Sequence, residues 1–294
     1  MGFSVNTSSK ISNEEPGSII AAVIQFLPSQ HKLFGDGLLF IEAWILTLVS
    51  VYATRLIGVP EPGLIGIVLA SAAMTPSLNR ILALNRSRIW SEEGNGRRVN
   101  LESIISGLSL FFGMFSAFIM IGIINSDSVI IEDFNFIVTR IHLDPNAVLS
   151  PERFSHGSSI FQNNLSVLIT LTIMSFIYRS LGAMFALGWN AGVWGVTMVL
   201  FMSTGRDTDL NSVVYAIIIL IAILPHLITE AASYLVGALA AIFLSRGLTI
   251  YKINDARINR VLAAVGVLAL LAVGLVVAGA VLENYIPRLV LELI

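Results

Sequence analysis

Long runs of apolar residues dominate the chain, and shorter polar segments separate them. A bilayer core about 30 Å thick requires about 20 mostly apolar residues per helix. Seven runs approach or exceed that length, at approximately 38–57, 63–84, 101–124, 164–178, 183–202, 213–244 and 261–282. The pattern therefore predicts an all-α fold, a polytopic transmembrane helical bundle with about seven spans.

The composition supports a membrane protein and excludes several other classes. Hydrophobic residues make up 55% of the chain and charged residues only 12%, against about 25% charged in a soluble domain. The net charge of -2 gives no basic surface for nucleic acid, so the lipid bilayer is the expected partner. The chain has no cysteine, which excludes disulfides and thiolate metal sites.

Lys and Arg in the short connections predict the orientation, because they collect on the cytosolic side. One basic connection carries Arg80, Arg86, Arg88, Arg97 and Arg98, and another carries Arg246, Lys252, Arg257 and Arg260. The first sixteen residues are polar and do not resemble a secretory signal. We expect a multi-pass protein of the cell membrane with both connections and the N-terminus in the cytosol.

Three regions follow from this reading. Residues 1–37 form a cytosolic segment with a short interfacial helix at 19–27, residues 38–100 form a transmembrane hairpin and a basic linker, and residues 101–294 form a transmembrane core. The core includes an outer loop at 125–163. Loops of that length usually have structure or function of their own.

The sixth span is too long for one straight crossing. Residues 213–244 would extend roughly 48 Å as a helix, well beyond the bilayer core. Pro225 lacks an N–H, and its ring clashes with the carbonyl four residues earlier. The sequence predicts that this helix is broken or kinked near Pro225, with free carbonyls near Ile221.

His226 and Glu230 follow the proline at i and i+4, so they share one helical face. The small residues Ser233, Gly237 and Ala241 continue that face and favour close helix contact, which turns the polar pair into the bundle. Ionisable groups inside a span are candidates for function. Three interpretations stay open: a hydrogen-bonded clasp between helices, handling of protons or a small cation, and a metal site.

Other polar residues lie in or beside the predicted spans. Asn190 lies between Gly188 and Gly192, which favour close packing, and we expect its amide to reach the His226–Glu230 face. Asn163 and Asn164 open the fourth span, where an Asn commonly caps a helix. The predicted intramembrane polar site is therefore Asn190, His226, Glu230, Asn163 and Asn164. Two further acids, Glu42 and Glu283, are expected at membrane interfaces.

Four segments together resemble the stage II sporulation protein M family of integral membrane proteins. They are Phe161-Gln162-Asn163-Asn164-Leu165, Gly188-Trp189-Asn190-Ala191-Gly192, Leu224-Pro225-His226 with Glu230 and Gly237, and Glu283-Asn284-Tyr285-Ile286-Pro287. The resemblance runs from about residue 101 to the C-terminus. It departs at Leu227, where many members have glycine. It implies a membrane protein whose namesake works with partners that remodel peptidoglycan.

Two functions remain open at this stage. One is a channel or transporter that passes a small cation or protons through the Asn/His/Glu site. The other is a membrane scaffold that recruits other membrane or envelope proteins without transport. The chain has no GxxxxGK, HExxH or GxSxG motif, so we expect neither an enzyme nor a bound cofactor. A homo-oligomer is compatible with both functions.

Overall fold

The structure is a computed structural model that describes residues 32–90, 96–140, 157–204, 211–252 and 254–292. All regular elements in these residues are α-helices: α2 (Lys32–Ile57), α3 (Pro62–Trp90), α4 (Gly96–Ile124), α5 (Asp127–Asp133), α6 (Asn135–Arg140), α7 (Gly157–Tyr178), α8 (Ser180–Thr204), α9 (Ser212–Ile250) and α10 (Ala256–Leu291). The all-α fold class is confirmed.

Seven of these helices, α2, α3, α4, α7, α8, α9 and α10, are long and apolar enough to cross a membrane. They match the seven predicted spans in order. The largest difference at a start is in α7, which begins at Gly157 and not at Asn164. The chain is therefore a multi-pass membrane protein.

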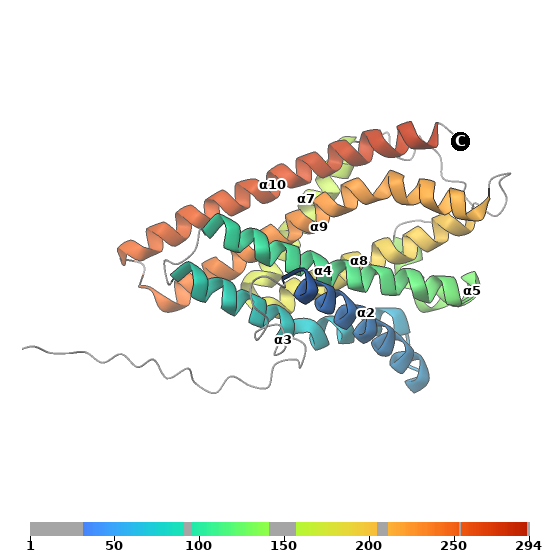
Figure 1. Cartoon of the computed structure of the whole chain (residues 1–294), viewed down its shortest axis with the longest axis horizontal. Helices are drawn as coiled ribbons and strands as arrows, with labels where there is room; N and C mark the ends of the chain where they lie inside the picture. The colour runs from blue at the N-terminus through green and yellow to red at the C-terminus, as the bar shows by residue number, and fades with distance from the viewer. Residues whose placement is uncertain (1–31, 91–95, 141–156, 205–210, 253, 293–294) are drawn as a thin grey trace, which may run out of the picture.

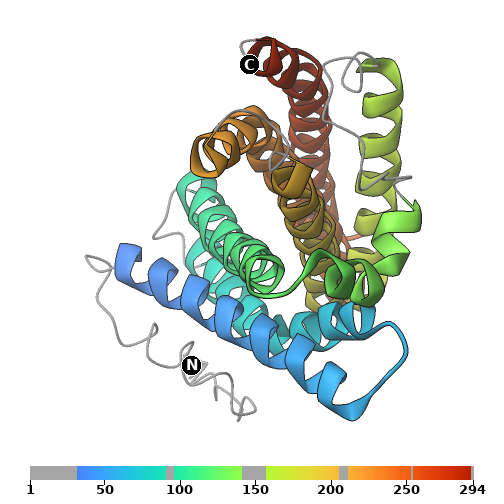
Figure 2. The ribbon, with the colours of Figure 1, turned by 90° about the vertical axis from the view of Figure 1, so that its right-hand side faces the viewer.

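The long helices form one elongated bundle (Figures 1 and 2). Helices α4 and α8 lie in its middle and contact each other. Helices α2 and α3 pack on one side of them, α7 and α9 pack on the other, and α10 packs on α7 and α9. Helices α9 and α10 form an antiparallel pair along most of their length (Figure 1). This arrangement places the N-terminal hairpin away from α10.

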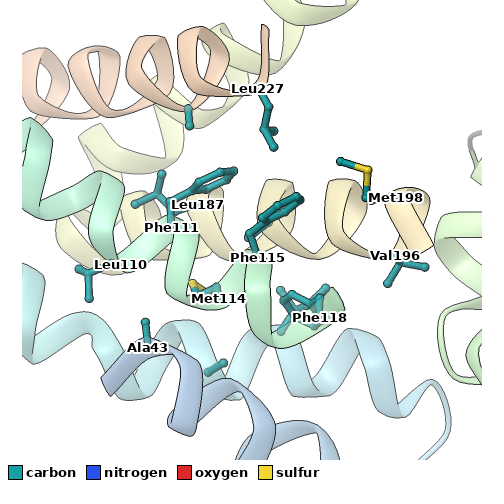
Figure 3. Packing of buried hydrophobic residues seen from close by; sticks show 14 of the residues in the cluster. Ala43, Leu110, Phe111, Met114, Phe115, Phe118, Leu187, Val196, Met198 and Leu227 are labelled. Carbon is teal, nitrogen blue, oxygen red and sulfur yellow. The ribbon is translucent and has the colours of Figure 1, made fainter. Parts of the chain in front are cut away.

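Aromatic residues of α4 fill the centre of the bundle. Phe111, Phe115 and Phe118 are buried, and their rings lie between α8 and α9 on one side and α2 and α3 on the other (Figure 3). Gly113 lets α2 approach closely, because a Cβ there would lie 2.3 Å from the carbonyl oxygen of Phe40. The N-terminal hairpin is therefore packed into the same core.

The first hairpin turns as the sequence predicts. Gly58 and Glu61 adopt φ values of 70° and 54°, which lie in the left-handed region that glycine reaches without strain. Thr54 donates a hydrogen bond to the carbonyl oxygen of Pro62 at 2.9 Å. This bond joins the last turn of α2 to the first turn of α3.

The described part of the connection between α4 and α7 contains two short helices, α5 and α6. Ile130, Phe134 and Ile137 are almost fully buried, and Phe134 packs against Gly63 of α3. Arg55 of α2 forms an ion pair with Asp133 of α5. The expectation that this loop has structure of its own is confirmed for residues 127–140.

The predicted break at Pro225 does not form. Helix α9 continues from Ser212 to Ile250 with Pro225 inside it, although its axis bends along the way (Figure 1). A proline removes one ladder hydrogen bond, and the neighbouring turns hold a helix together when other helices pack around it. A bend therefore replaces the break, and Pro225 remains a helical residue.

Two predicted features lie wholly or partly outside the described residues. The interfacial helix at 19–27 lies outside them altogether. The basic connection between α3 and α4 includes residues 91–95, which are also outside them.

Candidate functional site

The polar face of α9 points into the bundle. The exposed fractions of His226, Glu230 and Ser233 are 0%, 2% and 0%. Gly237 continues this face, and a Cβ there would lie 2.6 Å from Cδ1 of Leu168 on α7. Ala241, one turn further on, is also buried. The small residues therefore pack closely, as expected, and they bring α7 beside Glu230.

Both carboxylate oxygens of Glu230 accept a hydrogen bond from a neighbouring helix. Nδ2 of Asn164 on α7 donates to Oε1, and the indole nitrogen of Trp194 on α8 donates to Oε2 at 3.2 Å. Three consecutive helices, α7, α8 and α9, thus meet at one side chain. A buried carboxylate needs such donors, because an unpaired one would be costly in a low-dielectric interior.

A second carboxylate reaches the same amide. Nδ2 of Asn164 also lies 3.5 Å from Oε2 of Glu283 on α10, while Oδ1 of Asn164 accepts from Nδ2 of Asn163 at 3.2 Å. Gly279 of α10 faces this part of α9, because a Cβ there would lie 3.3 Å from Oγ1 of Thr229 and 3.5 Å from Cγ of Glu230. Asn164 therefore bridges Glu230 and Glu283.

Within the described residues, neither carboxylate is paired with a basic side chain, since no Lys or Arg forms an ion pair with Glu230 or Glu283. On insertion scales, the most costly charged side chains lose about 2.5 to 3.5 kcal/mol each when they are placed inside a membrane. Two like charges that share a site also repel each other. The arrangement therefore favours neutralisation by a proton or another cation.

His226 does not form the expected hydrogen-bonded pair with Glu230. In the part of the chain that the structure describes, neither ring nitrogen of His226 has a hydrogen-bond partner. Its ring instead packs edge-on against Trp194, with ring centroids 5.0 Å apart. The interpretation as a direct His–Glu clasp is wrong for this conformation, because Asn164 and Trp194 already occupy both oxygens of Glu230.

Asn190 is buried but is not joined to the pair. Its Nδ2 donates to the carbonyl oxygen of Ala186 on its own helix at 2.8 Å, and within the described residues no hydrogen bond links it to His226 or Glu230. Gly188 and Gly192 pack against Ser71 and Ile67 of α3, on a different side of the bundle from α9. These glycines permit close packing, as predicted, but with α3.

The sequence pattern placed two residues of this site, Asn164 and Glu283, near the ends of their helices. Asn164 is not a cap, because α7 begins at Gly157 and the residue lies inside the helix with 5% exposure. Glu283 is not at the end of a helix, because α10 continues to Leu291. Asn163 contributes only through its bond to Asn164.

Sequence reasoning missed Trp194 altogether. Trp194 follows Asn190 by four residues, so the two share a face of α8. Its indole N–H is a hydrogen-bond donor on that face, and this signal could have identified it. Glu42, a buried acid of α2, lies elsewhere. It accepts hydrogen bonds from Ser77 of α3 at 2.9 and 3.0 Å and is 5% exposed.

The site combines hydrogen-bond donors with ionisable side chains. No group of three or more His, Asp or Glu side chains suited to a metal occurs in the residues searched, which are those that the structure describes. The arrangement offers a paired carboxylate with amide and indole donors. Such a pair binds or releases positive charge.

No family model, curated protein or solved structure matches the chain. The resemblance to the stage II sporulation protein M family therefore stays a prediction that rests on the four segments quoted from the sequence. The functional argument depends on the site itself.

Proposed function

We propose that this membrane protein is a channel or transporter for a small cation or protons, and that Asn164, Glu230 and Glu283 form its intramembrane site. The observation that carries the proposal is the single amide of Asn164, which donates to carboxylates from two different helices. Among the described residues neither acid has a Lys or Arg partner. Such a pair binds positive charge readily, and ionisable groups at membrane depth commonly mark ion pathways.

The position of the site in the bundle supports ion movement. Glu230 lies inside α9 and Glu283 inside α10, and both helices are long enough to span. Asn164 and Trp194 reach them from α7 and α8. A relative movement of these four helices would change the donors around the carboxylates, and so would change their affinity for a cation.

The test is ion flux into liposomes that contain the purified full chain. Glu230→Gln and Glu283→Gln each keep a hydrogen-bonding side chain of similar size and remove the charge. We expect flux to fall about tenfold or more in both, since a loss of about 1.4 kcal/mol of ion affinity corresponds to a factor of ten. Glu42→Gln is the matched control, because it neutralises a buried acid that contacts Ser77 and not this site.

Flux that is the same in the wild type, Glu230→Gln and Glu283→Gln would contradict the proposal. If those variants are folded, that result would favour the alternative of a membrane scaffold without transport. Size-exclusion profiles and thermal unfolding of each variant establish that a loss of flux is not a loss of fold.

A further inference from the structure

We propose that the ion bound at this site is a proton, which Glu230 and Glu283 share and which His226 accepts in exchange. This inference rests on the proposed function and narrows the small cation to one species. It depends on which atoms around the carboxylates are donors, and on the surroundings of His226.

The polar atoms around Glu230 are arranged to donate hydrogen bonds and not to coordinate a metal. Both of its oxygens already accept from N–H groups of Asn164 and Trp194. The amide oxygen of Asn164, which could have been a cation ligand, accepts from Asn163. Hard cations take several oxygen ligands at once, and among the described residues no three His, Asp or Glu side chains are grouped to hold a metal ion.

A proton fits the same set of atoms. With one proton on the pair, the site carries a single negative charge, and the N–H groups of Asn164 and Trp194 stabilise it. One carboxyl is then a neutral acid with an O–H to donate. Two acids that share one proton avoid the repulsion between two carboxylates in a confined site.

His226 gives an independent observation that points to a proton. Its side chain is fully buried at 0% exposure, and neither nitrogen has a partner among the described residues. Buried polar atoms are nearly always hydrogen-bonded, so an unpartnered one calls for an explanation. A neutral imidazole has one nitrogen that accepts a proton and one that carries it, and His226 lies one helical turn from Glu230.

The exchange step is a simple proton transfer. The O–H bond of the protonated carboxyl breaks, and an N–H bond forms at the free nitrogen of His226. The products are a carboxylate and an imidazolium. The imidazolium then gives the proton on its other nitrogen to water on one side of the membrane, which leaves the neutral ring in its other tautomer, and a flip of the ring resets it. A proton taken up from water on the opposite side restores the acid. A shift of Trp194, which contacts both groups, permits the transfer.

Few other titratable groups face this pair. Helix α8 contains none from Ser180 to Thr204, and α7 has only Tyr178 at its last residue. On α9, Tyr234 follows Glu230 by one turn and is 3% exposed.

On α10, Glu283 is the acid in contact, whereas Arg257, Arg260, Tyr285 and Arg288 bond to neither carboxylate. Arg98 and Glu102 of α4, which also packs on α9, pair with each other. The proton therefore has Glu230, Glu283 and His226 as its main acceptors.

Infrared spectroscopy of the protein in lipid nanodiscs tests the shared proton without relying on transport. We expect a carboxylic-acid C=O band near neutral pH that disappears in both Glu230→Gln and Glu283→Gln, because each leaves one carboxylate beside a neutral amide. Glu42→Gln should keep this band, and so should His226→Gln. If both Glu230→Gln and Glu283→Gln keep the acid band of the wild type, the inference is overturned.

Flux measurements separate this inference from the proposed function. In liposomes with a pH-sensitive dye inside, we expect proton flux that does not depend on sodium or potassium and that falls in His226→Gln. Sodium or potassium flux that is lost in Glu230→Gln, without the acid band, would overturn the shared proton and keep the transport function. The acid band without flux of any ion would keep the shared proton and overturn the transport function.

Discussion

The indole nitrogen of Trp194 donates a hydrogen bond to Oε2 of Glu230 at a distance of 3.2 Å. The same ring packs its edge against His226, with ring centroids 5.0 Å apart. One side chain of α8 therefore contacts both ionisable residues on the polar face of α9. It holds the carboxylate through its N–H and packs against the imidazole through its ring.

Trp194→Phe removes the N–H and keeps an aromatic ring beside His226. A hydrogen bond to a charged group contributes about 1.5 to 3 kcal/mol, so we expect a loss of that order in the free energy of unfolding, together with lower ion flux. Trp189→Phe is the control, because Trp189 is on the same helix as Trp194 but packs against Phe185 of α8 and Phe136 of α6. Equal effects of the two substitutions would show that the indole N–H of Trp194 has no special role.

Glycines in the bundle should differ sharply in their tolerance of a methyl group. A Cβ on Gly113 would lie 2.3 Å from the backbone oxygen of Phe40, whereas a Cβ on Gly274 meets nothing within 4 Å. Overpacking costs about 1 to 3 kcal/mol, so Gly113→Ala should unfold at lower temperature. Gly274→Ala should be neutral or slightly stabilising, because alanine favours helix. Similar melting of both variants would contradict the packing of α2 on α4.

Asp255, which lies between the last two spans, should give the start of α10 a pH dependence. Hydrogen bonds from the Arg257 side chain and backbone lower the pKa of Asp255 from 3.8 to about 2, and its side chain caps the helix by accepting from the Arg257 N–H at 2.9 Å. A lowered pKa stabilises the fold above 3.8, and this contribution is lost as the pH falls toward 2. Carboxyl ¹³C NMR should give a midpoint near 2, and a midpoint near 3.8 would exclude the contact.

The two ends of the bundle should lie on opposite sides of the membrane. The turn between α9 and α10 and the short helix α5 lie at opposite ends of the molecule (Figure 1), and Asn254 and Ser128 are both exposed there. Because the chain has no native cysteine, Asn254→Cys and Ser128→Cys give clean labelling. An impermeant reagent applied to intact cells should label only position 128. Labelling of position 254 instead would reverse the orientation.

The spans were predictable because crossing a bilayer imposes a length and a composition that appear directly in the sequence. The same criterion misplaced Asn164 and Glu283. Both were assigned near the ends of spans because an apolar run starts or stops beside them, whereas α7 begins at Gly157 and α10 continues to Leu291. Polar residues that contact each other inside the bundle interrupt an apolar run without ending the helix.

The partners of Glu230 could not be chosen from helical periodicity. The spacing correctly placed His226 and Glu230 on one face, but a face does not specify which neighbouring helix it meets. Asn190 and Trp194 share a face of α8, and the shorter Asn190 bonds to the carbonyl of Ala186. The longer indole of Trp194 reaches Glu230. The length of each side chain, compared with the gap between α8 and α9, decided which one contacts Glu230. That gap depends on the packing of the whole bundle.

The most direct test of the central claim, that Glu230 and Glu283 act as one ion-binding site, is a double-mutant cycle on ion flux. Glu230→Gln, Glu283→Gln and the double variant are compared with the wild type in liposomes. Residues that act as a unit have non-additive effects, so we expect the double variant to be no slower than either single variant. Losses that multiply, or a Glu283→Gln protein with wild-type flux, would contradict a shared site.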